Sequence, residues 1–407
     1  MKNILSILTA ILISVSFMGN IHADEIANID IHGFISQGYL KTNHNNYLAM
    51  TEDGSFNFLE TGVNLSTNLT EDFHIGLQLF SRKLGDEGGN DIVLDWAYAD
   101  YHWQDWLGGR LGRIKPVFGL YNETRDFDML RTSVFLPQSE YPEIWRDTFS
   151  SIKGVGLYGT LPQMPFGKIS YDLQIGSILF EEDGGIVSSL KGSLLGNFGV
   201  DITDTESDNS VWITLKWQTP LDGLRLQGTY ADLNDLTLIG TWHAPPPFGD
   251  GIQVQPFVYD LRDVYAYTLS AEYTWENLIL AAEYHSMDTK LLLNNTISQD
   301  RTTEGWYVSG SYRFSDLFEL GLSYSEYYPN ADDKNGTEQV SSFQITNDFE
   351  AWLKTYAVST RFDINDFCIL KFEVQRNNGF GMWSSASNPD RLHEDWYLFA
   401  AKTTVSF

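Results

Sequence analysis

Residues 395–407 read DWYLFAAKTTVSF, and the chain stops on Phe407. Counting back from the end, Val405, Phe399 and Tyr397 lie on the same side of the chain as Phe407. A period of two predicts a β-strand, because successive side chains of a strand point to opposite faces. Chain ends are usually polar and frayed unless the fold holds them. A final strand with an apolar face therefore needs a neighbouring strand on each of its edges.

Other segments show the same alternation: residues 211–217, 264–273, 306–314, 318–325 and 368–375. Aromatic residues stand near the ends of the apolar faces, and the opposite faces carry small or charged residues. This pattern is typical of a transmembrane β-barrel, in which an apolar band with aromatic girdles meets lipid and the other face lines a wet lumen. A soluble β-sandwich or propeller also alternates and is the alternative fold.

The N-terminal segment predicts export from the cytoplasm. Lys2 precedes an apolar run over residues 4–18, and the small residue Ala23 closes the segment. These are the features of a secretory signal peptide, so we expect residues 1–23 to be removed and residues 24–407 to form the mature barrel. A membrane anchor is the alternative, but the run is shorter than the about 20 apolar residues of a spanning helix.

The bulk composition narrows the class of protein further. The net charge of −28 opposes binding to nucleic acid, whose phosphates need a basic surface. The single cysteine, Cys368, excludes an intrachain disulfide framework. After the signal peptide no segment is long and apolar enough to be a spanning helix. A large exported β protein and an outer-membrane barrel both fit, and only the barrel would span lipid.

The connections between strands predict how many strands there are. Short joints fall at residues 69–72, 104–107, 162–166, 219–223, 274–277, 315–316 and 365–366. Longer segments alternate with them at residues 42–54, 85–91, 115–151, 181–208, 233–262, 288–302, 328–349 and 377–391. Seven turns and eight loops predict about 16 antiparallel strands, with the last strand paired to the first at residues 29–41. An extra hairpin within residues 233–262, which contain three consecutive prolines, would give about 18.

Together these features resemble a Gram-negative outer-membrane porin, and the resemblance extends over the whole mature chain. It implies location in the bacterial outer membrane, passage of small hydrophilic solutes and assembly as a homotrimer. It also implies that the last strand is the assembly signal read by the barrel-assembly machinery, carried by Tyr397, Phe399, Val405 and Phe407.

A narrower likeness lies in residues 109–126, GRLGRIKPVFGLYNETRD. This stretch resembles porins of the phosphate-selective type, in which a similar run leads into the constriction loop. The matching residues are Gly112, Lys115, Phe118, Gly119 and Leu120. The rest of the loop departs from that pattern, because it carries many carboxylates.

The third loop, residues 115–151, is the longest connection, and in porins it folds into the lumen and narrows it. A loop of this length is usually functional or disordered, and its many apolar residues indicate an ordered one. A solvated surface loop is the alternative. The candidate pore-constriction residues are Lys115, Glu123, Arg125, Asp126, Asp128, Arg131, Glu140, Glu143, Arg146 and Asp147.

The polar faces of the strands supply candidates for the lumen wall. These are Asp95, Lys216, Arg225, Glu272, Glu283, Arg313, Glu319, Arg361, Lys371 and Glu373. A pore selects by its width and by the charges at its narrowest part, whereas ion pairs within the wall would be structural. Since acids only modestly outnumber bases in the third loop, we expect a weak preference for cations or none. Acid-rich stretches at residues 181–183, 201–208 and 331–333 are expected in outer loops, where divalent cations would bridge them to lipopolysaccharide.

The sequence shows no constellation for enzyme chemistry. No HExxH or GxSxG element and no cysteine pair accompanies its histidines, and His285 beside Glu283 is the only loose candidate. We therefore expect an all-β channel for passive diffusion across the outer membrane, with no catalytic residue, metal site or cofactor. A channel specific for phosphate or other anions, sugars or dicarboxylates is the alternative function.

Overall fold

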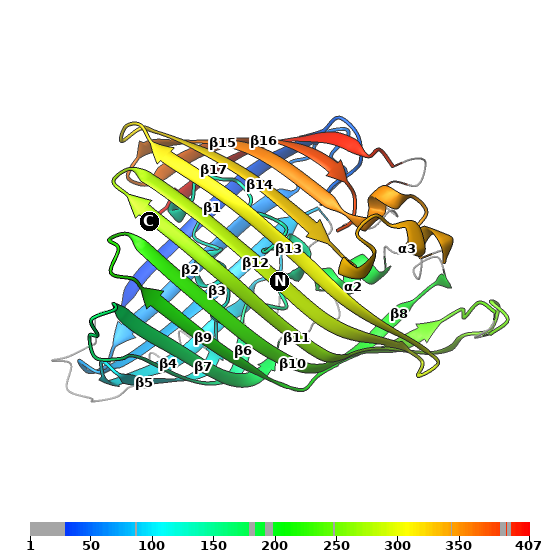
Figure 1. Cartoon of the computed structure of the whole chain (residues 1–407), viewed down its shortest axis with the longest axis horizontal. Coiled ribbons are helices and arrows are strands. Elements are labelled where there is room, and N and C mark those ends of the chain that lie inside the picture. The colour runs from blue at the N-terminus through cyan, green and yellow to red at the C-terminus, as the bar shows by residue number, and fades with distance from the viewer. Residues whose placement is uncertain are drawn as a thin grey trace, which may run out of the picture.

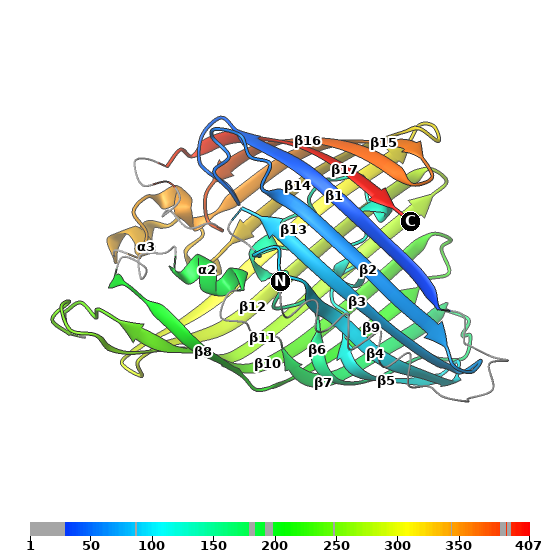
Figure 2. The ribbon, with the colours of Figure 1, turned by 180° about the vertical axis from the view of Figure 1, so that it is seen from behind.

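The computed structural model describes residues 29–85, 88–178, 184–191, 198–246, 249–342, 344–382, 388 and 392–407. The predicted signal peptide and residues 181–183 lie outside this part of the chain. One continuous antiparallel sheet runs obliquely around the molecule and forms its wall (Figures 1 and 2).

The first half of the wall consists of β1 (Asp30–Thr42), β2 (Phe58–Asn68), β3 (Phe73–Leu84), β4 (Val93–Gln104), β5 (Leu107–Ile114), β6 (Ile152–Thr160), β7 (Lys168–Ile178), β8 (Asp201–Ser207) and β9 (Asn209–Gln218). The second half consists of β10 (Leu224–Trp242), β11 (Gln255–Trp275), β12 (Leu278–Leu293), β13 (Ile297–Arg313), β14 (Phe318–Tyr328), β15 (Leu353–Asn365), β16 (Cys368–Gly379) and β17 (Asp395–Ser406).

The sheet closes on itself through its first strand. Phe34 of β1 lies opposite Gly62 of β2 on one edge and opposite Ser406 of β17 on the other. β8 and β9 pair with successive halves of β10 and are separated only by Asp208, so they act as one interrupted strand. The 17 strand segments therefore make a 16-stranded barrel, which confirms the predicted fold class and the pairing of the last strand with the first.

The alternative of an extra hairpin within residues 233–262, which would have given about 18 strands, is excluded. β10 continues to Trp242 and β11 begins at Gln255, which leaves only residues 243–254 as the connection. The alternation of Leu236, Leu238 and Trp242, all buried, extends the strand as far as the prolines, which cannot continue a sheet ladder. The connection at 288–302 likewise shrinks to residues 294–296, and residues 201–207 form β8 rather than an outer loop.

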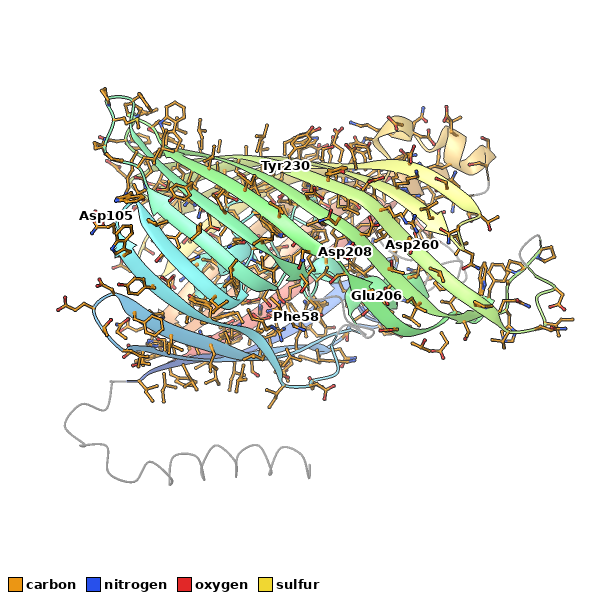
Figure 3. All side chains as sticks on the ribbon, turned by 90° about the horizontal axis from the view of Figure 1, so that it is seen from below. Phe58, Asp105, Glu206, Asp208, Tyr230 and Asp260 are labelled. Carbon is orange, nitrogen blue, oxygen red and sulfur yellow. The ribbon has the colours of Figure 1, made fainter. Side chains whose placement is uncertain are left out.

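The two faces of the wall differ as the alternation predicted. In β17, Tyr397, Phe399 and Val405 are exposed on the outside, whereas Lys402 and Thr404 are buried on the inside. Figure 3 shows side chains covering the outside of the wall, with Asp105 at the end that carries the short turns and Asp260 toward the loop end. An apolar exterior around a polar interior is the arrangement that a lipid bilayer requires.

A row of small residues crosses the wall where the long loop begins. Gly112, Gly154, Gly176 and Ser210 are paired neighbours on β5, β6, β7 and β9. A Cβ atom on Gly154 would lie 2.0 Å from the carbonyl oxygen of Ile175, far inside van der Waals contact. Glycine in a strand often marks such a close backbone approach, here at a bend of the barrel wall.

We expect the substitution Gly154→Val to lower the yield of folded barrel sharply, because the side chain would meet the neighbouring backbone. The measurement is the fraction that migrates as the compact form in unheated detergent gels. Gly228→Val is the matched control, because a Cβ there meets only the end of the Leu269 side chain, at 3.7 Å. Equal yields for the two variants would contradict this explanation.

The remaining regular elements are short helices in the connections. They are α2 (Gly185–Lys191), α3 (Thr337–Ser341) and the 3-10 turns η1 (Asn122–Thr124), η2 (Asp128–Leu130), η3 (Glu143–Trp145), η5 (Ala331–Asp333) and η6 (Asp348–Ala351). Figure 1 shows α2 and α3 together at the loop end of the barrel. Among the described residues, no helix has the length and apolar character to span a membrane.

Candidate functional site

The connection between β5 and β6, residues 115–151, runs through the interior of the barrel. Pro116, Pro137 and Pro142 interrupt any strand ladder, and the chain adopts the short turns η1, η2 and η3 instead. Its apolar residues Val134 and Tyr141 are buried, so the loop carries packed contacts of its own. Three groups of contacts fix it to different sides of the wall.

The first group, the tyrosine anchor, lies against β12 and β13. The buried Glu283 carboxylate accepts hydrogen bonds from the Leu120 backbone N–H at 2.7 Å and the Tyr141 hydroxyl at 2.5 Å. It also accepts from the Tyr307 hydroxyl at 2.6 Å and the Ser270 hydroxyl at 2.6 Å. One wall carboxylate therefore holds both the start and the middle of the loop.

The second group, the lysine anchor, lies against β16 and β17. The Asp128 carboxylate is 3.1 Å from Lys371 Nζ and 3.3 Å from Lys402 Nζ, and it accepts a hydrogen bond from the Thr404 hydroxyl at 2.7 Å. Burial raises the pKa of Asp128, but the two lysine charges outweigh burial and hold that pKa well below its usual range. Glu373 adds a contact by accepting from the Val134 backbone N–H at 2.8 Å.

The third group, the arginine anchor, lies against β4. Arg146 pairs with Asp95 of the wall at 2.9 Å and with Asp126 of the loop at 2.8 Å. Asp126 also pairs with Lys115 at 2.7 Å. Burial raises the pKa of Asp126, but Arg146 and Lys115 lower it further than burial raises it.

Weaker contacts fill the gaps between the anchors. Loop carbonyl or side-chain groups bond to Arg82 of β3, Gln174 of β7, Thr214 of β9, Gln227 of β10, Glu272 of β11, Glu319 of β14 and Arg361 of β15. Since these strands surround the barrel axis, the loop extends across the width of the lumen.

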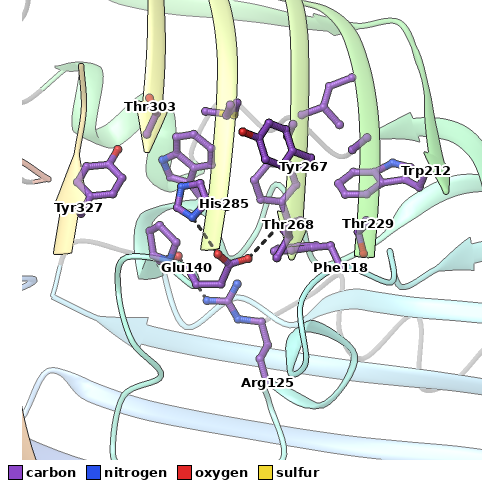
Figure 4. A pocket seen from close by; sticks show the side chains of 17 residues that line it. Phe118, Arg125, Glu140, Trp212, Thr229, Tyr267, Thr268, His285, Thr303 and Tyr327 are labelled. Atoms are coloured by element: carbon purple, nitrogen blue, oxygen red, sulfur yellow. Dashed lines mark hydrogen bonds and ion pairs between the residues drawn. The ribbon is translucent and has the colours of Figure 1, made fainter. Parts of the chain in front are cut away.

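Space remains on both sides of the loop. Towards the short turns, a cavity of about 450 Å³ lies between the loop and the wall of β9 to β15. We call it the turn-side cavity. Small wall residues border it on β13 and β14, namely Ser309, Ser311, Gly321 and Ser323. Towards the loops, a second cavity of about 60 Å³, the aromatic pocket, is lined by Phe118, Phe149 and Trp212 among others (Figure 4).

The ten loop residues singled out from the sequence all lie in this interior segment. Five are largely buried and closely paired, namely Lys115, Asp126, Asp128, Glu140 and Arg146. Arg125 is buried but lies 3.8 Å from the nearest carboxylate oxygen, on Glu143. Arg131, Glu143 and Asp147 are partly open. Glu123 is the most open, with 38% of its side chain exposed.

The ten wall residues divide in the same way. Asp95, Glu283, Glu319, Arg361, Lys371 and Glu373 are buried, Glu272 is mostly buried, and Lys216, Arg225 and Arg313 are open. The open charges pair across the turn-side cavity or along its wall. Lys216 lies 3.1 Å from Glu123 of the loop, and Arg225 lies 2.9 Å from Glu272.

The match to the phosphate-selective pattern does not produce a free cation here. Lys115 is held by Asp126 at 2.7 Å and lies 4.0 Å from Asp95, and its side chain is largely buried. Two carboxylates therefore neutralise the lysine that the motif would offer to an anion.

Several interior residues were not among the sequence candidates. Tyr141 and Tyr307 were missed because an aromatic residue in a loop or strand first indicates packing. Lys402 and Glu60, which pair at 2.7 Å, were missed although Lys402 stands on the polar face of the last strand. Arg82, which bonds Glu143 at 2.7 Å, also stands on an inward position of its strand. The strand parity alone could have identified all three charged residues.

A closed antiparallel barrel with an apolar exterior and a polar loop across its lumen belongs to the class of outer-membrane channel proteins. Residues 183–333 match the family described as Gram-negative porin. This match over part of the chain, together with the barrel fold, confirms the predicted resemblance to Gram-negative porins, a channel function in general terms and the location in the bacterial outer membrane.

Solved structures of outer-membrane proteins share the fold. The structure of Salmonella typhi OmpF, described as a complex with daunomycin, aligns with a TM-score of 0.58 at 12% identity, over 94% of this chain and 98% of that one. An anion-selective porin from Comamonas acidovorans aligns with a TM-score of 0.56 at 12% identity, over 94% of this chain and 100% of that one. Pseudomonas putida OprB aligns with a TM-score of 0.53 at 11% identity, over 93% of this chain and 94% of that one. A search of curated proteins by sequence gave no match.

Proposed function

We propose that the protein is a passive channel for small hydrophilic solutes, driven only by their concentration gradient and without enzymatic activity. The observation that carries this proposal is the loop itself. It is anchored to several sides of the wall and leaves space beside it for small hydrated solutes. The turn-side cavity is bordered by the loop segment 130–137 and by the serines of β13 and β14. Their small side chains leave room for a solute beside the loop.

Swelling of proteoliposomes in sugars of increasing size tests the proposal. We expect the rate to fall steeply from a pentose to a trisaccharide and to rise in proportion to sugar concentration without saturating. Absence of swelling with the pentose would reject the channel. Saturation with one solute class would favour the substrate-specific alternative.

The open charges of the turn-side cavity are expected to set ion selectivity. Glu123 with Lys216 and Arg225 with Glu272 balance each other, so we propose a channel with little preference between cations and anions. In the double variant Lys216→Glu, Arg225→Glu, four carboxylates line the same space. We expect the zero-current potential in a salt gradient to shift clearly towards cation preference.

The control for this shift is Arg376→Glu, an equal change of sign on the outward face of β16, where 62% of the side chain is exposed. Its zero-current potential should match that of the wild type. Equal potentials for the double variant and the wild type would place the narrowest charged part of the channel elsewhere.

We further propose that residues 1–23 direct export and that the last strand guides assembly. The backbones of Phe407 and Gly33 exchange two hydrogen bonds of 3.0 Å, so the final residue completes barrel closure, while the Phe407 ring remains exposed. We expect Phe407→Ser to lower the amount of assembled barrel in outer-membrane fractions. Phe367→Ser, at an equally exposed phenylalanine in a turn, is the control. Equal losses would contradict a special role for the terminus.

The remaining partners follow from the resemblance to porins. We propose a homotrimer that packs through the apolar outer face, and acidic outer loops that contact lipopolysaccharide through divalent cations. The mass of the detergent-solubilised protein, measured by light scattering after chromatography, tests the trimer.

A further inference from the structure

The aromatic pocket faces the loop end of the lumen, so a solute entering from that end reaches it before the loop. Apolar side chains dominate its lining, among them Phe118, Phe149, Trp212, Met287 and Tyr327. The Phe118 and Trp212 rings stack with centroids 5.9 Å apart. Ligand pockets are typically apolar with a few polar groups that fix orientation.

One of its polar groups is a buried guanidinium with poor partners. Arg125 is only 6% exposed, and its hydrogen bonds, to the carbonyl oxygens of Tyr141 and Pro142, are long at 3.5 and 3.4 Å. The nearest carboxylate oxygen, on Glu143, is 3.8 Å away. A buried charge without close partners is costly, so this guanidinium retains donor capacity for an incoming anion.

A second buried arginine of the same loop, Arg146, is fully paired with carboxylates. Arg146 holds carboxylates of Asp126 at 2.8 Å and Asp95 at 2.9 Å. Burial lowers the pKa of both arginines, but the carboxylates outweigh burial only for Arg146, whose pKa is raised. The contrast shows that the loop can satisfy a buried arginine and leaves Arg125 unsatisfied.

The acidic group of the pocket is, by contrast, already satisfied. Glu140 accepts hydrogen bonds from Thr268 at 3.2 Å and pairs with His285 at 2.8 Å (Figure 4). Both of its oxygens are engaged, so it does not call for a cationic ligand. A ligand that suits the pocket therefore offers a hydrogen-bond acceptor to Arg125 and a flat apolar ring to the aromatic side chains.

We propose that the aromatic pocket binds small aromatic carboxylic acids, with the ring against Trp212 and Phe118 and the carboxylate on Arg125. A planar carboxylate matches the fork of a guanidinium, and ring stacking adds to the affinity. This inference deepens the proposed channel function, on which its physiological role rests, by naming a solute class that would be retained on its way to the loop.

Calorimetric titration of the mature protein in detergent with benzoate tests the proposal. We expect saturable binding of one benzoate per chain, with acetate and benzylamine showing none. Arg125→Gln should weaken binding about tenfold or more, the loss of one charged hydrogen-bonded contact. Arg376→Gln, on the outward face, should leave binding unchanged.

A second variant separates the ligand contact from the fold of the loop. Ala266 lines the pocket from β11 and contacts none of the anchors, so Ala266→Phe should fill the pocket and abolish binding while Arg125 keeps its contacts. Benzoate binding that survives Ala266→Phe would overturn the site, and so would preferential binding of benzylamine. Proteoliposome swelling without benzoate binding would reject the pocket alone, whereas benzoate binding without swelling would reject the channel alone.

Discussion

Replacement of Asp128 by alanine is expected to destabilise the docked loop by about 3–5 kcal/mol, because it leaves two buried lysines without their shared carboxylate. Lys371 and Lys402 are essentially unexposed, and Asp128 is the carboxylate that joins them to the loop. We expect urea unfolding of the protein in lipid vesicles to show this decrease in the free energy of unfolding. We also expect trypsin to cleave the loop at Arg125 and Arg131, which are sheltered when the loop is docked.

Two further variants decide whether buried charge is the cause. Asp147→Ala removes a partly exposed carboxylate of the same loop and should cost less than about 1 kcal/mol. The triple variant Asp128→Leu, Lys371→Met, Lys402→Met removes these three charges and leaves Glu60, the other partner of Lys402, with Arg82 at 3.8 Å. It should recover most of the stability, because apolar replacement of a buried ion cluster is often neutral. A triple variant as unstable as Asp128→Ala would contradict this account.

Removal of the loop itself should have the largest effect on transport. Replacing residues 122–146 by a short glycine-serine linker deletes the central contacts of all three anchors and leaves the strands intact. The exposed interior is mostly polar, so water should fill it. We expect the single-channel conductance to increase several-fold, since the loop spans the lumen in the native protein.

The control shortens another connection, the one that joins the loop ends of β10 and β11 over residues 243–254. Replacement of these residues by the same linker should leave the conductance close to that of the wild type. A native-like conductance after deletion of residues 122–146 would show that the narrowest part of the channel is not made by this loop.

The sequence was sufficient for the fold because each strand carries its own period. In β17 the alternation of apolar and polar residues predicted which face is outside, with Phe399, and which is inside, with Lys402. The number of turns and loops predicted the number of strands. Prediction failed where local signals pointed away from the observed pairing. The prolines after Trp242 indicated a loop over residues 233–262, but the apolar alternation up to that residue continued the hairpin.

The site was predictable in content and not in arrangement. Loop length and strand parity identified Asp128 and Lys371 as interior charges, yet these residues are 243 positions apart in the chain. Which carboxylate meets which cation depends on the path of the loop through the lumen, and no local pattern encodes that path. The role of Tyr141 could not be predicted for the same reason, because it depends on the hydrogen bond that its hydroxyl donates to Glu283.

Planar-bilayer recording of the purified mature protein tests the central claim most directly. The account predicts step-like increases of conductance, with a zero-current potential close to zero in a salt gradient. A bilayer that stays silent at every protein concentration, or a protein that remains monodisperse in buffer without detergent, would contradict it.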